Sequence, residues 1–583
     1  MKILGISCEQ DAGAAVNING KIVTAVNEER FNRKKLYIGF PRLSILEVCK
    51  KVGLKPADFD YIAISTHIHV PYIGFSSPVL HQKIAERLSK IKLIQKLLKK
   101  RFFIHCIKII LYILQAKYRK EIVKDLRELG FSQKVHFVDH HTCHASSAYY
   151  TSGWKDSLVI TLDGAGDGFC SKVFELKNNK LQELHSVPFY ASPGYYYAYA
   201  TKICGFKCGR EGKLTGLAAF GNPEITKDIF ASRIKYDQKK MIFVNYGHYL
   251  NNELTPLKLA LNGSKKEDIA AGIQSYIEEI VTAYISDLIK HFRNNRPTKL
   301  TLAGGVFANV KLNQKISELK NVEELYVYPH MGDGGLAVGA SFALLMKKRL
   351  PLIPYKLENA YLGLSYTNKE ILDALSFHQA NYHITNNPAL TMAKALHDNK
   401  VVAYYNGAME YGPRALGHRS IFVSAKDPTI NQTLNTKLER SEFMPFAPIV
   451  LKENENDYFL NLDSKHNCTK FMTITTQITK KALIDIPAAV HIDGTARFQS
   501  ITKEQNPVIH EMLTIYHAMT GVPAVINTSF NMHEEPIVES PENAIECFQK
   551  GHLDMLVLGN YVLENKQMST IDKKEETELT LVR

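Results

Sequence analysis

Short apolar runs that end in small, glycine-containing turns recur along the first part of the chain. The run at residues 2–8 leads into such a turn, and the following residues predict a β-hairpin across positions 19–20. The run at residues 157–162 leads into the acidic, glycine-rich turn 163–168, and a second hairpin is predicted through positions 178–179. Because the same unit occurs twice, the pattern predicts a duplicated α/β fold whose two similar lobes close on a nucleotide.

Other segments extend this alternation of strands and helices. Predicted elements are a helix at residues 43–52, strands at 61–65, 135–138, 401–405, 421–423 and 525–527, and strand–glycine junctions followed by helices at 300–309 and 326–335. A basic, proline-containing stretch at residues 347–354 is the predicted linker. Because 583 residues are too many for one hydrophobic core, we expect two domains, at residues 1–350 and 357–583.

The positive charge of the chain is concentrated in one segment. The formal net charge is +14, and twelve lysines or arginines against one glutamate between residues 83 and 120 contribute +11 of it. The rest is close to neutral, so the overall basicity does not indicate nucleic-acid binding. Residues 80–128 have a helical pattern and are expected to form an insertion. Their cations alternate with Ile, Leu and Phe, which is typical of a helix on an anionic membrane surface, although a solvated helix has the same pattern.

Cysteine usage and the first residues bear on the compartment. The nine cysteines form no paired array, which is usual for thiols of a large intracellular enzyme. The chain starts with a strand pattern rather than a signal peptide. No apolar run approaches the roughly 20 residues that a membrane-spanning helix needs. We therefore expect a cytoplasmic protein.

A histidine pair is the strongest candidate for metal chemistry. His140 and His144 are four residues apart, so a helix places both imidazoles on one face, where they can bind one divalent transition metal. Ordinary helix surface is the alternative reading of this spacing. Asp333 lies between two glycines on a tight turn and would complete a site of two histidines and one carboxylate, which is typical of iron(II) or zinc.

The glycine-rich turns that follow strands are candidate phosphate sites. They let backbone amides approach phosphate oxygens, although such turns are common in any α/β protein. Asp11 and Asp163 hold equivalent positions in the two repeats, so their carboxylates are expected to face one another across the cleft and to hold a cation, a water or a substrate hydroxyl.

The second domain carries cations beside polar donors. Two arginines lie on the glycine-bounded turn 411–420, further cations follow, and short polar side chains end the strand at 525–527. Guanidinium groups clamp phosphate oxygens, so this set is typical of an anion-rich ligand site, although surface salt bridges are the alternative.

Nine ordered blocks resemble the NodU/CmcH-type O-carbamoyltransferase family over nearly the whole chain. They are DHHTCHA (139–145), TLDGAGDG (161–168), EGKLTGLAAFG (211–221), LAGGVFAN (302–309), GDGGLAVGA (332–340), GPRALGHRS (412–420), MPFAP (444–448), DGTARFQ (493–499) and NTSFNMHEEPIV (527–538). The resemblance implies a duplicated actin/hexokinase-like N-terminal domain and an α/β YrdC-like C-terminal domain. It implies formation of carbamoyl-adenylate from carbamoyl phosphate and ATP with magnesium, then transfer to a hydroxyl of a sugar, an antibiotic-like compound or a polysaccharide.

The resemblance also assigns roles to individual residues. It implies metal ligands at His140, His144 and Asp333, nucleotide contacts at Gly304, Gly305 and Asn309, catalytic roles for Asp163 and Lys213, and carbamoyl phosphate or adenylate contacts at Arg414, Lys437, Arg440, Arg497, Asn527 and Ser529. The family commonly has a His-Asp pair after the first strand, where this chain has Gln10 and Asp11. Gln10 cannot accept a proton at neutral pH, so Asp11, another group or the metal alone must activate the acceptor hydroxyl.

Two other functions share parts of this pattern. A tRNA threonylcarbamoyl-transfer enzyme would have the metal histidines but normally not the fused second domain. A non-catalytic nucleotide-binding regulatory protein would not need the two histidines and Asp333 together. No nucleic-acid partner is expected, whereas membrane contact through residues 83–120 and a homodimer stay open.

Overall fold

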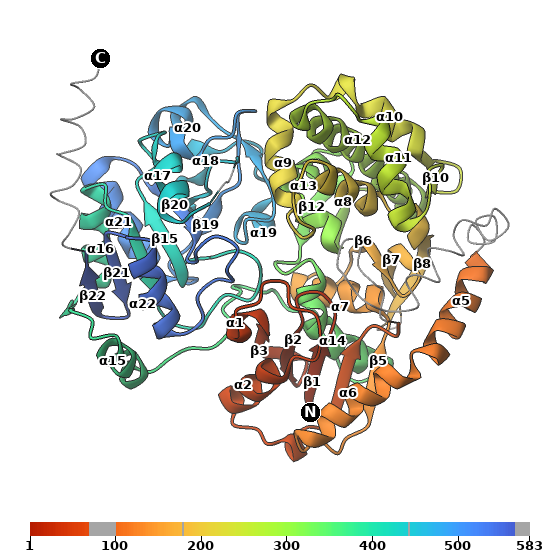
Figure 1. Cartoon of the computed structure of the whole chain (residues 1–583), viewed down its shortest axis with the longest axis horizontal. Coiled ribbons are helices and arrows are strands. Elements are labelled where there is room, and N and C mark those ends of the chain that lie inside the picture. Colours follow the sequence, from red (N-terminus) through yellow and green to blue (C-terminus); the bar gives the residue numbers. More distant parts are fainter. Residues whose placement is uncertain (69–100, 178–179, 441–442, 566–583) are drawn as a thin grey trace. The chain divides into compact units, whose positions relative to one another are not determined.

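The computed structural model describes residues 1–68, 101–177, 180–440 and 443–565 (Figure 1). The chain forms two compact units. The N-terminal unit comprises Met1–Asn32, Leu36–Glu358 and Asn461–Thr476, and the C-terminal unit comprises Arg33–Lys35, Asn359–Leu460 and Gln477–Arg583. Of the predicted features, the turn at 178–179 and the part of the basic segment before residue 101 lie outside the described residues.

The first lobe of the N-terminal unit is built on a five-stranded sheet of order β3-β2-β1-β4-β5. Its strands are β1 (Lys2–Ser7), β2 (Gly13–Ile18), β3 (Lys21–Asn27), β4 (Tyr61–Ser65) and β5 (Val135–Val138). The first three form an antiparallel meander, and β4 and β5 continue it in parallel with β1. The meander confirms the predicted hairpin at positions 19–20.

The second lobe repeats this arrangement with the order β12-β11-β6-β7-β8. Its strands are β6 (Leu158–Gly166), β7 (Phe169–Lys177), β8 (Lys180–Pro188), β11 (Thr298–Ala303) and β12 (Val322–Val327). Again three antiparallel strands are followed by two that run parallel to the first of them. The matching order confirms the predicted duplication and defines an actin/hexokinase-like fold.

Two helices lie between the sheets of these lobes, α7 (His140–Ser152) and α14 (Leu336–Lys347). Helix α14 packs on β1, β2 and β4, α7 packs on β6 and β11, and the two helices pack on each other. Gly339 allows this close approach, because a Cβ atom there would stand 2.0 Å from the carbonyl oxygen of Cys143. The core of each lobe therefore consists of sheet residues and small helix residues that are buried together.

Further helices cover the lobes. On the first lobe they are α1 (Glu29–Asn32) and α2 (Arg42–Val52), and on the second α8 (Pro193–Ile203), α9 (Glu211–Leu217), α10 (Lys227–Arg233), α11 (Leu254–Ala260), α12 (Lys266–Arg293) and α13 (Val310–Ser317). A small hairpin joins β9 (Ile234–Asp237) and β10 (Ile242–Asn245). The 28-residue α12 packs against α8, α9 and α10.

The described part of the basic segment is helical, as predicted. It forms α5 (Arg101–Leu114) and α6 (Ala116–Glu128), inserted between β4 and β5. Ile122 and Leu126 of α6 are buried in the core of the first lobe. Among the described residues, no helix is both long and apolar enough to cross a membrane.

Residues 461–476 belong to the N-terminal unit, although the sequence assigned them to the second domain. This segment includes α19 (His466–Thr469) and lies beside β12. The Ser464 carbonyl accepts from the Leu325 N–H at 2.9 Å, and Cys468 is fully buried in the core of the second lobe. These contacts join residues more than 130 positions apart, so local sequence pattern did not reveal them.

The C-terminal unit has a mixed sheet of order β13-β22-β21-β14-β15-β20-β16-β19. The strands are β13 (His383–Ile384), β14 (Val402–Tyr405), β15 (Arg419–Val423), β16 (Pro448–Leu451), β19 (Gln499–Ile501), β20 (Ala524–Ser529), β21 (Met555–Leu558) and β22 (Tyr561–Glu564). Its helices are α15 (Asn368–Phe377), α16 (Pro388–His397), α17 (Ile430–Lys437), α18 (Glu455–Tyr458), α20 (Lys480–Asp485), α21 (Pro507–Thr520) and α22 (Pro541–Lys550). This is the α/β second domain that the sequence predicted.

Candidate metal centre

The two histidines of the candidate centre lie on the first turns of α7. Asp139 caps this helix, because its carboxylate accepts from the Thr142 N–H at 3.0 Å. The helix therefore begins at His140 and places His140 and His144 one turn apart with ring centroids 4.7 Å apart. Both side chains are buried, so the alternative of an exposed helix surface is wrong.

Two carboxylates face these imidazoles. His144 Nε2 lies 3.0 Å from Asp163 Oδ2 and 3.3 Å from Asp333 Oδ1. His140 Nε2 lies 3.6 Å from Asp333 Oδ1 and 3.9 Å from Asp163 Oδ2. One potential ligand atom from each of the four residues lies within 4.8 Å of the others. The structure thus brings together the three predicted ligands and adds Asp163, which the sequence had placed opposite Asp11.

The chemistry of this group fits a divalent transition metal. Nε2 of His140 and Nε2 of His144 are buried, and neither makes a well-aligned hydrogen bond with any described residue. Two imidazoles and two carboxylates form a typical ligand set for zinc or iron(II). Burial lowers the pKa of His140, but the Asp333 and Asp163 carboxylates outweigh it and raise that pKa to about 9. The carboxylates therefore favour a positive charge at this position, which a cation would supply.

The third histidine of the motif is not available to a metal. His141 Nδ1 is 2.8 Å from the Thr161 hydroxyl, and its Nε2 is 3.0 Å from the Phe169 carbonyl. Burial, followed by the charges of His140 and Lys172, lowers the pKa of His141 to about 3. His141 is therefore a neutral residue that joins α7 to the second sheet.

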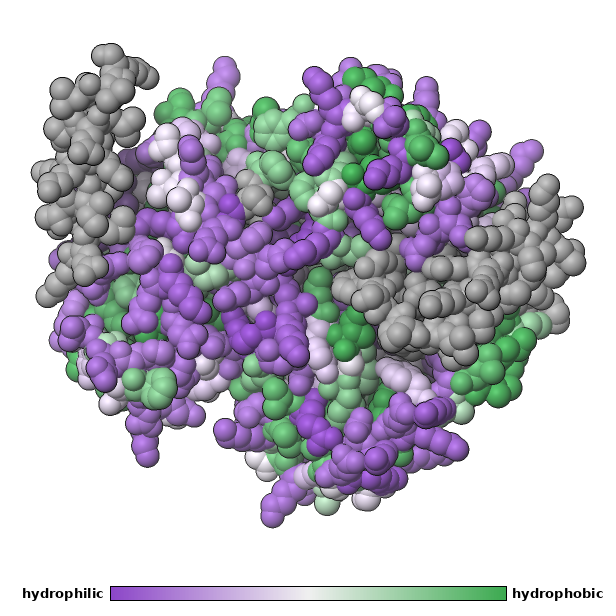
Figure 2. Space-filling model, viewed as in Figure 1, coloured by the Kyte–Doolittle hydropathy of each residue, from purple (hydrophilic) through white to green (hydrophobic). Residues whose placement is uncertain are grey.

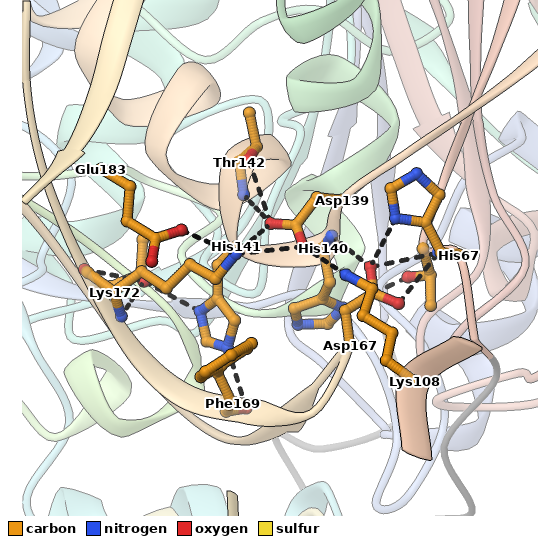
Figure 3. Close-up of polar contacts among 12 residues, drawn as sticks. His67, Lys108, Asp139, His140, His141, Thr142, Asp167, Phe169, Lys172 and Glu183 are labelled. Atoms are coloured by element: carbon orange, nitrogen blue, oxygen red, sulfur yellow. Dashed lines mark hydrogen bonds and ion pairs between the residues drawn. The ribbon is translucent and has the colours of Figure 1, made fainter. Parts of the chain in front are cut away.

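A network of charged residues supports the N-terminal end of α7 (Figure 3). The Asp139 carboxylate accepts from Lys108 Nζ at 3.0 Å and from Lys172 Nζ at 3.1 Å. Lys172 also pairs with Glu183 at 3.2 Å. Lys108 comes from α5, so the basic insertion contacts the cap of the helix that carries the candidate ligands. Sequence reasoning missed this network, since only the capping position of Asp139 is visible locally.

Asp167 supports the same helix from the turn after β6. Its fully buried carboxylate accepts from the backbone N–H groups of His140 at 2.8 Å, His67 at 3.1 Å and Ile68 at 2.9 Å. Asp139, Asp167 and His67 lie close enough together to resemble a second metal group. Their carboxylates, however, already accept from ammonium and backbone N–H donors, so we interpret them as structural support.

Asp11 has a partner that the sequence did not reveal. His330 Nε2 lies 3.4 Å from Asp11 Oδ2 and 2.9 Å from Asn27 Oδ1. The Asn27 amide nitrogen donates to the carbonyls of Asp11 at 2.7 Å and Gly334 at 3.3 Å, so its oxygen must face His330. His330 therefore carries its proton on Nε2 and donates it to Asn27. Burial, with the nearby Arg30 charge, lowers the pKa of His330 to about 3, so the ring is neutral.

The other predicted residues of the N-terminal unit have different surroundings. The Gly305 N–H donates to Asp163 Oδ2 at 3.1 Å, so this turn contacts the candidate centre. Asn309 caps α13 through the Leu312 N–H at 3.1 Å. Gly304 adopts φ 110°, which favours glycine. Lys213 lies half-buried on α9. Nucleotide contacts and a catalytic role for Lys213 stay predictions.

Arg440 organises part of the predicted anion site in the C-terminal unit. Its guanidinium donates to the Thr528 hydroxyl at 3.0 Å and to the Ser529 carbonyl at 2.7 Å. Asn527, on the same strand, donates to the Gln499 side chain at 2.8 Å. The structure therefore brings three predicted residues, Arg440, Asn527 and Ser529, together at the C-terminal end of β20.

The remaining cations of this unit differ in their surroundings. Lys437 donates to the His552 carbonyl at 2.8 Å. Arg414 and Arg497 are partly buried, and their binding roles stay predictions. Arg419 is fully buried, donates to the Asn406 carbonyl at 2.8 Å and lies over the Tyr405 ring at 3.6 Å. Arg419 is therefore a structural residue of this turn.

The duplicated lobes and the second α/β unit define a two-part enzyme architecture, and sequence comparison identifies its class. The chain belongs to the carbamoyltransferase family: residues 2–342 match the carbamoyltransferase N-terminus, and residues 393–565 match the carbamoyltransferase C-terminus. The protein is therefore a transferase of the carbamoyltransferase type, which excludes the non-catalytic alternative.

Relatives extend over most of the chain. Nodulation protein NolNO of Sinorhizobium fredii is 30% identical over 580 residues, which cover 96% of this chain and 80% of NolNO. The uncharacterized protein MJ1051 of Methanocaldococcus jannaschii is 31% identical over 577 residues, covering 96% of this chain and 99% of that protein. Among solved structures, HypF of T. kodakarensis is 14% identical, covers 60% of this chain and 48% of its own, and has a TM-score of 0.34.

Proposed function

We propose that this carbamoyltransferase acts in two ATP-dependent steps. Its C-terminal unit would form carbamoyl-adenylate from carbamoyl phosphate and ATP, with magnesium on the nucleotide. Its N-terminal unit would transfer the carbamoyl group to a hydroxyl of a sugar, an antibiotic-like compound or a polysaccharide. The observation that carries the proposal is the group of two buried histidines, His140 and His144, and two partly buried carboxylates, Asp163 and Asp333, in a chain of the carbamoyltransferase family.

Each step has a defined flow of atoms. In the first, water splits carbamoyl phosphate into phosphate and carbamate, and a carbamate oxygen displaces pyrophosphate from the α-phosphorus of ATP. In the second, the acceptor oxygen attacks the carbamoyl carbon, its proton passes to a base, and AMP leaves with the electrons of the broken acyl–oxygen bond. The cations and polar donors around Arg440 suit the anionic reactants of the first step.

The four-residue group suits the second step. A divalent cation held there, iron(II) or zinc, would supply Lewis-acid stabilisation of the charge that develops on the carbonyl oxygen. His140 Nδ1 lies 3.2 Å from the Thr66 hydroxyl, and this contact orients Nε2 toward the carboxylates. The carboxylates of Asp163 and Asp333, which are only partly exposed, would balance the two positive charges of a divalent cation.

Asp11 is the proposed proton acceptor for the acceptor hydroxyl, in place of the histidine that the family commonly has at position 10. The neutral His330 ring directs its Nε2–H toward Asn27 and lies 3.4 Å from the Asp11 carboxylate. His330 and Asn27 thus position Asp11 without competing for its proton. An Asp11→Asn variant should keep adenylate formation and lose transfer; equal loss of both steps would contradict this role.

Two measurements test the division of labour. Carbamoyl-phosphate-dependent release of AMP and pyrophosphate from ATP, without acceptor, reports the first step. An Arg497→Ala variant should lose this activity, and an Arg296→Ala variant, which removes an exposed arginine of the N-terminal unit, should keep it. A protein that never consumes ATP in the presence of carbamoyl phosphate would refute the proposed function.

Two histidine variants, one in the candidate centre and one outside it, test the second step. A His144→Ala variant should retain adenylate formation and lose metal binding and carbamoyl transfer. The exposed His291 on the last turn of α12 provides a matched control, because His291→Ala removes an imidazole outside the centre. Loss of adenylate formation in a folded His144→Ala variant would contradict the two-site mechanism. A thermal-shift screen of sugars, antibiotics and polysaccharide fragments would narrow the acceptor class.

A further inference from the structure

Helix α5 carries a stripe of exposed aliphatic side chains. Ile109, Ile110, Ile113 and Leu114 are 62%, 55%, 64% and 55% exposed. Positions spaced by one, four and five residues fall on one side of a helix. Figure 2 shows this apolar surface at the right-hand edge, where Figure 1 places α5. Lys108, on the opposite side of the helix, donates to Asp139 at 3.0 Å, and Ile107 at the edge of the stripe packs against the core of the second lobe, so the helix is anchored.

A pocket of about 460 Å³ lies between α5 and β5. Ile109 and Tyr112 line it from the helix, Phe137 from the strand, and Lys108 and Lys347 also line it. Lys108 is paired with Asp139 at 3.0 Å, so the positive charge of the pocket comes from Lys347. The pocket therefore combines apolar walls with positive charge, as a site for an anionic amphiphile requires. His136 also lines it, and burial together with neighbouring lysines lowers the pKa of His136, which indicates a positive local potential.

The charge around α5 indicates what kind of partner could cover its apolar stripe. Residues 101–120 contain five lysines or arginines and no carboxylate. A two-fold contact with a second copy would place these cations opposite one another, which is unfavourable. A simple solvated helix does not expose four large aliphatic residues on one stripe. An anionic lipid surface satisfies both features, because it accepts apolar side chains and attracts cations.

We propose that α5 and the cationic pocket beside it dock on an anionic lipid surface, with the helix lying along the interface. A helix of 14 residues is about 21 Å long, too short to cross a hydrocarbon core of about 30 Å. Lys108 links α5 to Asp139 at 3.0 Å, so the docking helix contacts the cap of the helix that bears His140 and His144. Docking would thus hold the candidate centre at a set distance from the lipid.

Vesicle binding by the full chain tests this proposal without any measurement of carbamoyl transfer, so its failure would leave the proposed function intact. The protein should sediment with phosphatidylcholine vesicles that contain phosphatidylglycerol, and this binding should weaken with added salt and with pure phosphatidylcholine. The Ile110→Ser/Ile113→Ser variant should bind at least tenfold more weakly. The Ile225→Ser/Leu259→Ser variant removes two exposed aliphatic residues elsewhere in the N-terminal unit and should bind like the parent.

A second variant changes only charged residues. Its loss of vesicle binding therefore cannot result from misfolding caused by the serine substitutions. Lys117→Gln/Lys120→Gln changes two exposed lysines beside α5, and each lysine near an anionic surface contributes about fivefold to partitioning. We expect at least a tenfold loss, against no loss for Lys239→Gln/Lys240→Gln. Absence of parent binding to anionic vesicles would overturn the proposal. Equal binding by the parent, the serine variant and the Lys117→Gln/Lys120→Gln variant on α6 would overturn it as well, as would a concentration-dependent dimer that only the serine variant abolishes.

Discussion

Replacing Gly166 by alanine tests whether the position of the His140 ring determines metal binding. Gly166 ends β6, and a Cβ atom there would stand 2.0 Å from Cδ2 and 2.6 Å from Nε2 of His140. Ordinary contact begins at 3.4 Å, so the ring must move by about 1.4 Å. The backbone of Gly166 lies outside the left-handed region, so the substitution tests this contact and not backbone strain.

The displacement is large compared with the tolerance of a metal site, which is about 0.5 Å. The ring cannot move freely, because the His140 N–H donates to Asp167 Oδ2 at 2.8 Å and Nδ1 lies 3.2 Å from the Thr66 hydroxyl. We therefore expect Gly166→Ala to lose one of four ligands. The affinity for zinc should fall by at least 100-fold, which corresponds to about 2.7 kcal/mol.

Titration calorimetry of the metal-stripped protein with zinc, together with elemental analysis, measures this change. The matched control is Gly212→Ala, because a Cβ atom at this helical position has no neighbour within 4 Å. Gly166→Ala should keep carbamoyl-adenylate formation while transfer falls. Parent-like zinc affinity in a folded Gly166→Ala variant would refute the conclusion that the His140 ring is a ligand in the position described.

Three further substitutions test the surroundings of the centre. Asp167→Asn replaces a buried carboxylate that accepts from three backbone N–H groups. The zinc affinity of this variant should fall about 10- to 100-fold. The same zinc affinity in parent and variant, measured by calorimetry, would contradict a supporting role for Asp167. Gly339→Ala places a Cβ atom 2.0 Å from the Cys143 carbonyl, so the unfolding free energy in urea should fall by about 1–3 kcal/mol; an unchanged midpoint would show that α7 and α14 adjust freely. His330, with its pKa lowered to about 3 by burial, binds no proton in the folded protein between pH 6.5 and 5, whereas the unfolded chain does. The free energy of unfolding should therefore fall by up to about 1.4 kcal/mol for each pH unit of acidification. In urea titrations, the His330→Gln variant should show a weaker dependence of this free energy on pH. The same pH dependence in parent and variant would contradict a buried neutral ring.

Local features of the sequence predicted the elements that carry the centre. The strand at residues 135–138 and the helix that carries His140 and His144 follow from neighbouring residues, because strand pattern and helical spacing act over short distances along the chain. The pairing of His140 with His144 was visible for the same reason. The position of Asp333 between two glycines on a tight turn suggested it as the carboxylate ligand, and the resemblance to a known family implied the same role.

The sequence did not reveal which side chains complete the contacts of these residues. Asp163 seemed equivalent to Asp11 by repeat position, yet it faces the histidines, whereas Asp11 faces His330. His141 lies in the same motif as the two candidate ligands, and the fold gives it hydroxyl and carbonyl partners for both of its nitrogens. In each case the deciding contact comes from a residue on another strand or turn.

By itself, the sequence determined the repeated strand–turn–hairpin units, the helical histidine pair and the concentration of charge around α5, because these features depend on neighbouring residues. Only the tertiary structure decided that Asp163 joins the centre, that Lys108 and Lys172 hold its helix cap, and that residues 461–476 complete the N-terminal unit. The physical reason is that the free energy of these contacts comes from burial and charge pairing between distant segments. Hydrophobic pattern specifies which face of an element is buried, but it does not specify the partner that covers that face.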